Sequence, residues 1–333
     1  MKRKSIFTSI LVIALALTLV LGVVGCDNNK DPKVTNPSKT NAPDTPDTPD
    51  TPDSKEIHVY TRDSSSGTRE GFEAVVGFKG QLTEKANEVA SNGQMAQQVG
   101  QDVHGIGYVS LVTNFAENNL KPLKYEGVEP SADNVNNGSY TLKRPFCFTT
   151  RAADDYASDE QRQIVAAFIA YLMDSKEGRE VVRAAGGIVD VEGGTPWDEL
   201  KADHPIVDQD NSGLTIVTGG STSVEKAVTA ALESFQGIAG NVQFKMDQTG
   251  SGAGWERVLG PEKDGPNGSD IGFASRNFKD DKEPIGDAMR SGAFCQDAIV
   301  AVVHADNPID NVTQDDLLKI FTGATTNWDV VGK

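Results

Sequence analysis

The chain has 333 residues, a length that allows two ordinary domains with sizeable cores. Hydrophobic residues make up 38% and charged residues 24%, as in a folded soluble chain, and with a formal charge of −17 the sequence has no basic stripe for nucleic acid. Such an acidic chain repels small anions at long range, so an anion site in it would need local dipoles and a few arginines.

Residues 1–25 have the features of an export signal, because a basic start precedes a long apolar run that ends in small residues. The ending VVGC resembles the lipobox of bacterial lipoproteins, although Val23 and Val24 stand where Leu and Ala or Ser are more usual. This resemblance implies a lipid on Cys26 and anchoring at the extracytoplasmic face of the cell membrane. The alternative is an uncleaved membrane-spanning helix, which the length of the run also permits.

Residues 26–55 form a tether rather than a domain. They repeat Thr-Pro-Asp and contain almost nothing that could pack in a core. Proline keeps such a chain extended and aspartate keeps it solvated, so we expect a semi-rigid spacer ahead of a folded body that begins near residue 56.

The segment TRDSSSGTREGF, residues 61–72, places serine, glycine and threonine between Arg62 and Arg69, just before apolar residues at helical spacing. The simplest interpretation is a loop that caps a helix. The alternative is an anion cradle, because the first N–H groups of a helix lack partners and the helix dipole places about half a positive charge there.

Two later loops have the same character: TGGSTSVEKAV over 218–228 and TGSGAGWERVLG over 249–260. Short apolar segments, among them EIHVYT, LTIVTGG and DIGFAS, alternate with the helical patterns. This alternation predicts α/β domains, in which ligands bind beyond the carboxyl ends of the strands. If the three loops converge, their hydroxyl and N–H groups could replace the water shell of a tetrahedral oxyanion.

These motifs together resemble the phosphate-binding protein of the bacterial high-affinity phosphate ABC importer. The segments GGSTSVEKAV, TGSGAG, DIGFASR, DAIVAVVHADNP and IFTGATTNW are similar to the first part of that family's chain. The segments YTRDSSSGTREGF, SNGQMAQQVGQDVHGIGYVSL and FIAYLMDSKEGREVVRAAGG are similar to the second part.

The resemblance implies the type II periplasmic binding protein fold, in which two α/β lobes, joined by two crossover strands, close over one phosphate. It also implies an extracytoplasmic solute-binding protein that delivers inorganic phosphate to the membrane permease of an ABC importer. Such a protein needs no cofactor or metal and is not an enzyme.

The two parts stand in the reverse of the family's order, which predicts a circular permutation. One lobe would then consist of 56–140 plus 297–333 and carry the SGTR loop, and the other would consist of 141–296 and carry the GSTS and GSGAG loops. A rival account, in which half-proteins exchange between two chains, would require a dimer. The long connection over 190–213 favours a monomer.

In this arrangement Cys147 and Cys295 fall on the two crossover strands. In an exported protein the two could form a disulfide that links the two strands at the hinge. The alternative is a pair of buried free thiols, which is common for cysteine.

The resemblance assigns phosphate binding to a set of hydroxyl, N–H and guanidinium donors: Arg62, Ser66, Gly67, Thr68, Thr222, Ser223, Ser251 and Arg276. Two positions depart from the family. Ser64 stands where an acidic residue orients the arginine, a role that Asp63 could take, and Arg276 stands where an aspartate accepts the phosphate proton. The acceptor would then be Asp63, Glu70 or Asp297, or discrimination against sulfate would be weaker. The alternative for Arg276 is an ion pair outside the site.

Two other classes of function stay open. The same donor chemistry suits a binding protein or sensor for another tetrahedral oxyanion, such as sulfate or molybdate. A phosphoester hydrolase is less favoured, because no G-x-S-x-G elbow surrounds the loop serines and the four histidines, at positions 58, 104, 204 and 304, lack metal-ligand spacing.

Overall fold

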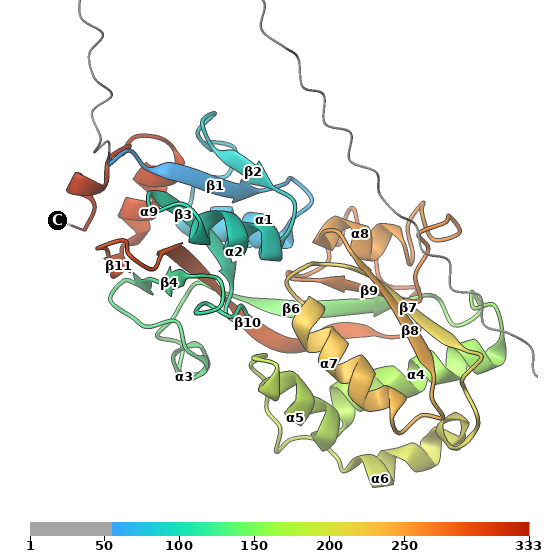
Figure 1. The fold of residues 1–333 in the computed structure, drawn as a ribbon. Coiled ribbons are helices and arrows are strands. Elements are labelled where there is room, and N and C mark those ends of the chain that lie inside the picture. Colours follow the sequence, from blue (N-terminus) through green and yellow to red (C-terminus); the bar gives the residue numbers. More distant parts are fainter. Residues whose placement is uncertain (1–54, 333) are drawn as a thin grey trace, which may run out of the picture. The chain divides into compact units, whose positions relative to one another are not determined.

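The computed structural model describes residues 55–332. The predicted signal peptide, the lipid site at Cys26 and all of the tether except Lys55 lie outside the described residues. The α/β class is confirmed, since helices alternate with the strands of a mixed sheet (Figure 1). Within this part of the chain, no helix has the length and apolar character needed to cross a membrane.

The strands of the main sheet are β1 (His58–Arg62), β2 (Asn87–Val89), β3 (Gly105–Ser110), β4 (Leu120–Pro122), β6 (Lys143–Thr150), β7 (Thr215–Gly220), β8 (Gln243–Gln248), β9 (Ile271–Ala274) and β10 (Ser291–His304). Their order is β2-β1-β3-β10-β6-β9-β7-β8, with β4 beside β10. A separate pair joins β5 (Lys124–Tyr125) to β11 (Asn311–Val312).

The helices are α1 (Gly67–Val76), α2 (Asn92–Gly100), α3 (Ala132–Asn136), α4 (Asp159–Asp174), α5 (Lys176–Ala184), α6 (Trp197–Leu200), α7 (Glu225–Gln236), α8 (Ser251–Glu256) and α9 (Gln314–Phe321), with 3-10 turns at Lys201–Asp203, Pro205–Asp208 and Trp328–Val330. Local sequence explains several starts. Ser66, Ser91 and Ser158 each cap a helix by accepting the N–H three residues on, and Thr313 forms a capping box with Asp316.

Two strands join the halves of the main sheet. The Ile299–Val303 part of β10 pairs antiparallel with β3, and its Ser291–Ala298 part pairs antiparallel with β6. Strand β6 then pairs with β9, so β6 and β10 run between the two halves, as Figure 1 shows. This arrangement agrees with the two crossover strands of the expected fold.

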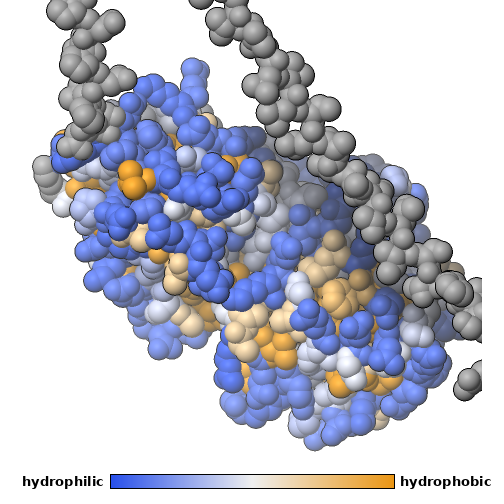
Figure 2. All heavy atoms as spheres, in the orientation of Figure 1, coloured by the Kyte–Doolittle hydropathy of each residue, from blue (hydrophilic) through white to orange (hydrophobic). Residues whose placement is uncertain are grey.

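Buried apolar side chains form two main clusters, one on each side of these crossovers. The first draws on residues 57–142, Ile188 and 298–331, and the second on residues 146–295. This burial supports our proposed lobes, 56–140 plus 297–333 and 141–296. The circular permutation stays a prediction. Hydrophilic residues predominate on the face shown in Figure 2, with apolar residues in small groups.

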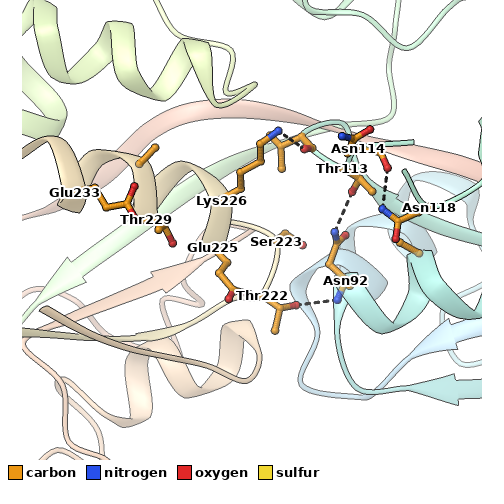
Figure 3. Close-up of a pocket in the computed structure, with 14 residues that line it drawn as sticks. Asn92, Thr113, Asn114, Asn118, Thr222, Ser223, Glu225, Lys226, Thr229 and Glu233 are labelled. Carbon is orange, nitrogen blue, oxygen red and sulfur yellow. Dashed lines mark hydrogen bonds between the residues drawn. The ribbon is translucent and has the colours of Figure 1, made fainter. Parts of the chain in front are cut away.

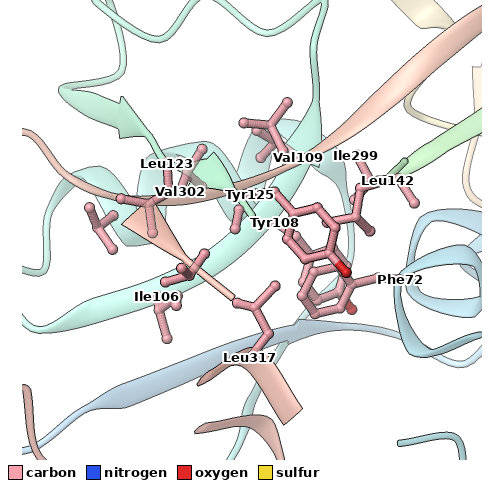
Figure 4. Packing of buried hydrophobic residues seen from close by; sticks show 14 of the residues in the cluster. Phe72, Ile106, Tyr108, Val109, Leu123, Tyr125, Leu142, Ile299, Val302 and Leu317 are labelled. Atoms are coloured by element: carbon pink, nitrogen blue, oxygen red, sulfur yellow. The ribbon is translucent and has the colours of Figure 1, made fainter. Parts of the chain in front are cut away.

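The first cluster includes an aromatic group under the sheet edge that carries the first loop (Figure 4). Phe72 stacks on Tyr108 with ring centroids 4.3 Å apart and meets Phe321 edge-on at 4.9 Å. The hydroxyl of Tyr108 bonds to Thr61 Oγ1 at 2.9 Å and accepts the N–H of Arg62 at 3.1 Å. The core therefore fixes the backbone at the end of β1.

We expect Phe72→Ala to lower the free energy of unfolding by about 3–5 kcal/mol, because it leaves a cavity among three packed rings. Urea denaturation checks this value. Val103→Ala is the control, since Val103 is 48% exposed and should change stability by no more than about 0.5 kcal/mol. A loss at Phe72 below about 1 kcal/mol would contradict this account of the core.

The possible disulfide between Cys147 and Cys295 is not formed, and both residues are buried free thiols. Cys147 lies opposite Ala293 and Cys295 lies opposite Phe146, with a shift of register between Ala293 and Cys295. The two side chains also pack in different apolar clusters, Cys147 against Phe278 and Cys295 in the second cluster. The alternative interpretation, two free thiols, holds.

Alkylation without reduction should label both cysteines only after the protein is unfolded. Burial raises the pKa of Cys147 to about 11 and raises that of Cys295 as well, so little thiolate is present at neutral pH. Peptide mass spectrometry after iodoacetamide treatment in denaturant measures this. Recovery of a peptide in which Cys147 is linked to Cys295 would show that the strands pair differently.

Candidate functional site

The three loops singled out in the sequence follow strands of the main sheet. The first connects β1 to α1, the second connects β7 to α7, and the third connects β8 to α8. Strands β7 and β8 are parallel, so their carboxyl ends lie at the same edge. Strand β1 belongs to the other half of the sheet and pairs in parallel with β2 and β3.

The three loops are in contact, and the third meets the first through the backbone, where Gly252 N donates to Ser65 O at 3.3 Å. Thr68 Oγ1 lies 2.8 Å from Ser223 Oγ, which joins the first loop to the second. Ser251 Oγ lies 3.2 Å from Ser275 Oγ and accepts the Ser275 N–H at 3.0 Å. We call Thr68, Ser223, Ser251 and Ser275 the hydroxyl cluster. All four residues are buried.

Gly67 lies where the first and third loops come together. A Cβ atom added at Gly67 would be 2.4 Å from Ser251 Oγ and 3.0 Å from Ser275 Oγ. Only a residue without a side chain fits this approach. The neighbouring Ser66 is also buried and uses its hydroxyl to cap α1, accepting the Arg69 N–H at 3.3 Å.

Arg62 is 1% exposed and lies at the end of β1, directly before this loop. Its Nε donates to Val89 O at 3.2 Å, and its Nη2 donates to Ala90 O at 3.0 Å and to Asp63 Oδ2 at 3.2 Å. Burial lowers the pKa of Arg62, while Asp63 opposes that shift. The guanidinium stays charged and is held in one orientation.

Thr222 lies beside the hydroxyl cluster and forms a further link between the two halves. Its Oγ1 accepts the Asn92 N–H from the start of α2 at 3.2 Å. Thr222 and Ser223 also border a groove of about 560 Å³ between α2 and α7 (Figure 3). On its α7 side, Lys226 Nζ donates to Val112 O at 3.1 Å across the groove.

Arg276 does not serve as a free anion donor. Its Nη1 and Nη2 donate to the two carboxylate oxygens of Glu283 at 2.6 and 2.7 Å, and its Nε lies 3.0 Å from Glu70 Oε2. A guanidinium held by two carboxylates has little charge left for a ligand. These ion pairs favour the alternative, an ion pair outside the site, over phosphate binding by Arg276, which stays a prediction.

The three expected proton acceptors have different surroundings. Glu70 also receives Lys279 Nζ at 2.8 Å; burial alone would raise its pKa, but Lys279 and Arg276 together lower it. A carboxylate with a lowered pKa is a poor proton acceptor. Asp297 is fully buried in contacts with Ser110 and an arginine, whereas Asp63 lies next to Arg62 and accepts its Nη2. Asp63 is thus placed for the orienting role.

Two residues near the site were not predicted from the sequence. Ser275 belongs to the DIGFASR motif, but the resemblance assigns a binding role there only to Arg276, the next residue, which occupies the family's aspartate position. Tyr108 carries no local signal, since its contact with Arg62 depends on the pairing of β1 with β3.

The chain is similar to known binding proteins. Residues 203–332 match the model of the PBP superfamily domain. Over 286 residues the chain is 28% identical to "Phosphate-binding protein PstS 2" of Streptococcus agalactiae serotype V, with 83% of this chain and 88% of the relative covered. A protein of the same name from Streptococcus pneumoniae serotype 4 is also 28% identical, over 84% of this chain and 88% of the relative.

The crystal structure of the phosphate-binding protein of a phosphate ABC transporter from Streptococcus pneumoniae superposes with a TM-score of 0.57 at 26% identity. The match covers 82% of this chain and 98% of that chain. The chain is PstS-like. The agreement with that PstS-like structure confirms the type II periplasmic binding protein fold expected from the sequence.

Proposed function

We propose that this PstS-like chain captures inorganic phosphate at the hydroxyl cluster and delivers it to the permease of an ABC importer. One observation carries the proposal. The Thr68–Ser223 contact of 2.8 Å brings the N-terminal ends of helices α1 and α7 together beside the buried Arg62. The names of the relatives, which are phosphate-binding proteins, support phosphate as the ligand.

The donors suit a tetrahedral oxyanion. Helices α1 and α7 both begin at this point, so unpaired N–H groups and the positive ends of two dipoles face the same region. The hydroxyls of Thr68, Ser223 and Ser251 can rotate from one another toward an anion, and Arg62 supplies a charge-assisted donor. Together these groups would replace the water shell that the anion loses.

The contacts favour binding over catalysis. Within the described residues, Ser223 Oγ bonds to Thr68 Oγ1, and Ser251 Oγ bonds to the hydroxyl and N–H groups of Ser275, rather than to a histidine or carboxylate base. An attacking serine needs such a base within hydrogen-bond reach. We therefore propose a solute-binding protein and not a phosphoester hydrolase.

The proposed location of the protein at the membrane is inferred from residues 1–55. A lipid on Cys26 would hold the protein at the extracytoplasmic face of the membrane, as a monomer on the Thr-Pro-Asp tether. In an extended polyproline-like form, a tether of this length would reach up to about 90 Å. That reach lets the binding body meet the permease without leaving the membrane.

Calorimetry with inorganic phosphate, sulfate, molybdate and arsenate tests the function. We expect phosphate to bind with a dissociation constant in the micromolar range or lower. Discrimination against sulfate rests on hydroxyls that can accept the phosphate proton, since Arg276 replaces the family's aspartate and Asp63 is held by Arg62. Tighter binding of sulfate or molybdate than of phosphate, or enzymic turnover of a phosphate ester, would overturn the proposal.

A further inference from the structure

Arg144 and Asp297 form a buried ion pair at the point where the two crossover strands meet. They are register partners on β6 and β10, with exposed fractions of 4% and 0%. Arg144 donates to Asp297 Oδ2 through Nε at 3.0 Å and through Nη2 at 2.9 Å. The two residues thus link the strands that connect the two apolar clusters.

One donor of this pair is left over. Arg144 Nη1 is buried and has no hydrogen-bond partner within the described residues. A buried donor on a charged group is costly to leave unpaired, and such groups in folded proteins usually have a partner or a function. Asp297 cannot accept this donor as well, because its other oxygen, Oδ1, already accepts from Ser110 Oγ at 2.8 Å and Leu111 N at 3.2 Å.

The fold places this donor under the start of α1. Helix α1 packs on β10, where a Cβ added at Gly71 would lie 3.0 Å from Ile299 Cδ1. Strand β10 runs antiparallel to β3, and β3 is parallel to β1. Helix α1, which returns from the end of β1, therefore runs in the same direction as β10.

The spacing of the two elements then locates Asp297. Three residues back from Gly71 is Thr68, about 4.5 Å along the helix, and two residues back from Ile299 is Asp297, about 6.8 Å along the strand. Residues two apart on a strand share a face, so Asp297 and its partner Arg144 face the first turn of α1. That turn carries Gly67 and Thr68 of the proposed anion site.

Charge and hydrogen bonding support the same placement. Burial lowers the pKa of Arg144, Asp297 opposes that shift, and the positive charge of Arg62 lowers it further, as expected for two nearby guanidinium groups. Asp297 also connects to the site by contacts, since Ser110 N donates to Asn92 Oδ1 at 2.9 Å and Asn92 N donates to Thr222 Oγ1.

We propose that Arg144 is a second arginine of the anion site, with its free Nη1 donating to the bound oxyanion while Asp297 holds the guanidinium in place. The proposal rests on the proposed phosphate function and adds a residue that the family motifs do not include. It also gives Asp297 a holding role in place of the proton-accepting role expected from the sequence.

Calorimetry with inorganic phosphate on four variants tests the proposal. Arg144→Gln removes the donor but leaves Asp297 buried without a cation, so the Arg144→Gln, Asp297→Asn double variant is the decisive one. Arg144→Lys keeps the positive charge but lacks the planar guanidinium group and its several N–H donors. The control is Arg151→Gln, because Arg151 is an ion-paired but only partly buried arginine just after β6, bonded to Ser269 O and Asp155.

We expect the double variant to fold, as judged by thermal melting, and to bind phosphate about 10- to 100-fold more weakly than the unaltered protein. The phosphate affinity of Arg144→Lys should lie between those of the double variant and the unaltered protein. Arg151→Gln should bind phosphate as the unaltered protein does. A folded double variant with unaltered phosphate affinity would overturn this inference alone. Failure of the unaltered protein to bind phosphate would overturn the proposed function and this inference with it.

Discussion

Arg62→Ala is expected to weaken phosphate binding by about a thousandfold or more. The Arg62 guanidinium is already fixed by Val89 O, Ala90 O and Asp63, so an anion that binds it loses little side-chain entropy. Truncating one partner of a buried, hydrogen-bonded charge pair typically costs 2–5 kcal/mol or more. In this variant the Asp63 carboxylate would also face the anion without its cation, which adds repulsion.

The measurement is calorimetry with inorganic phosphate, accompanied by thermal melting to show that the variant is folded. Arg62→Lys should recover part of the affinity, because lysine restores the charge but not the orientation that two backbone carbonyls impose on the guanidinium. Arg290→Ala is the control for loss of one positive charge, since Arg290 pairs with Asp174 and both side chains are more than a third exposed. If the phosphate affinity of Arg62→Ala stays within tenfold of that of the unaltered protein, the anion binds elsewhere.

Local sequence was sufficient to predict the elements that present the site. The serine before α1 and the glycine in the same loop are near-neighbour signals, and Ser66 caps the helix as expected. The alternation of apolar strands and helical patterns likewise predicted the α/β class. These features depend on residues a few positions apart, so propensity and spacing were enough.

Contacts between distant segments were harder to predict. Thr68 and Ser223 are 155 positions apart, and only the resemblance to a family suggested that they meet. Arg276 shows the limit of that resemblance: aligned with a ligand position, it is bound instead by Glu283, seven residues later, and by Glu70 from the other half. A sequence does not display how a new charge will be neutralised.

The cysteines and Arg144 show a second limit, which is strand register. The family resemblance placed Cys147 and Cys295 on the two crossover strands, but the register of these strands sets each cysteine opposite another residue. The same register pairs Arg144 with Asp297. Because one residue of slippage moves side chains to the other face, such pairs cannot be assigned before the strands are aligned.

Gly67→Ala is expected to weaken phosphate binding by about a hundredfold. The added methyl group would lie 2.4 Å from Ser251 Oγ and 3.0 Å from Ser275 Oγ, so both hydroxyls must turn or move away. A hydrogen bond from such a donor to a charged group contributes about 1.5–3 kcal/mol, so partial displacement of the two donors accounts for the expected loss. Calorimetry with phosphate measures it, with Gly213→Ala as the control, because a Cβ at Gly213 meets nothing within 4 Å.

Combining Gly67→Ala with Ser251→Ala separates a local collision from general damage to the fold. If the methyl group acts by displacing the Ser251 hydroxyl, then much of the Gly67→Ala effect should vanish in a protein that already lacks this hydroxyl, and the two losses should be less than additive. Fully additive losses would mean that Gly67→Ala disturbs α1 itself. The first and third loops would then not meet at one anion, since the effect of a methyl group on one would be independent of the hydroxyl on the other.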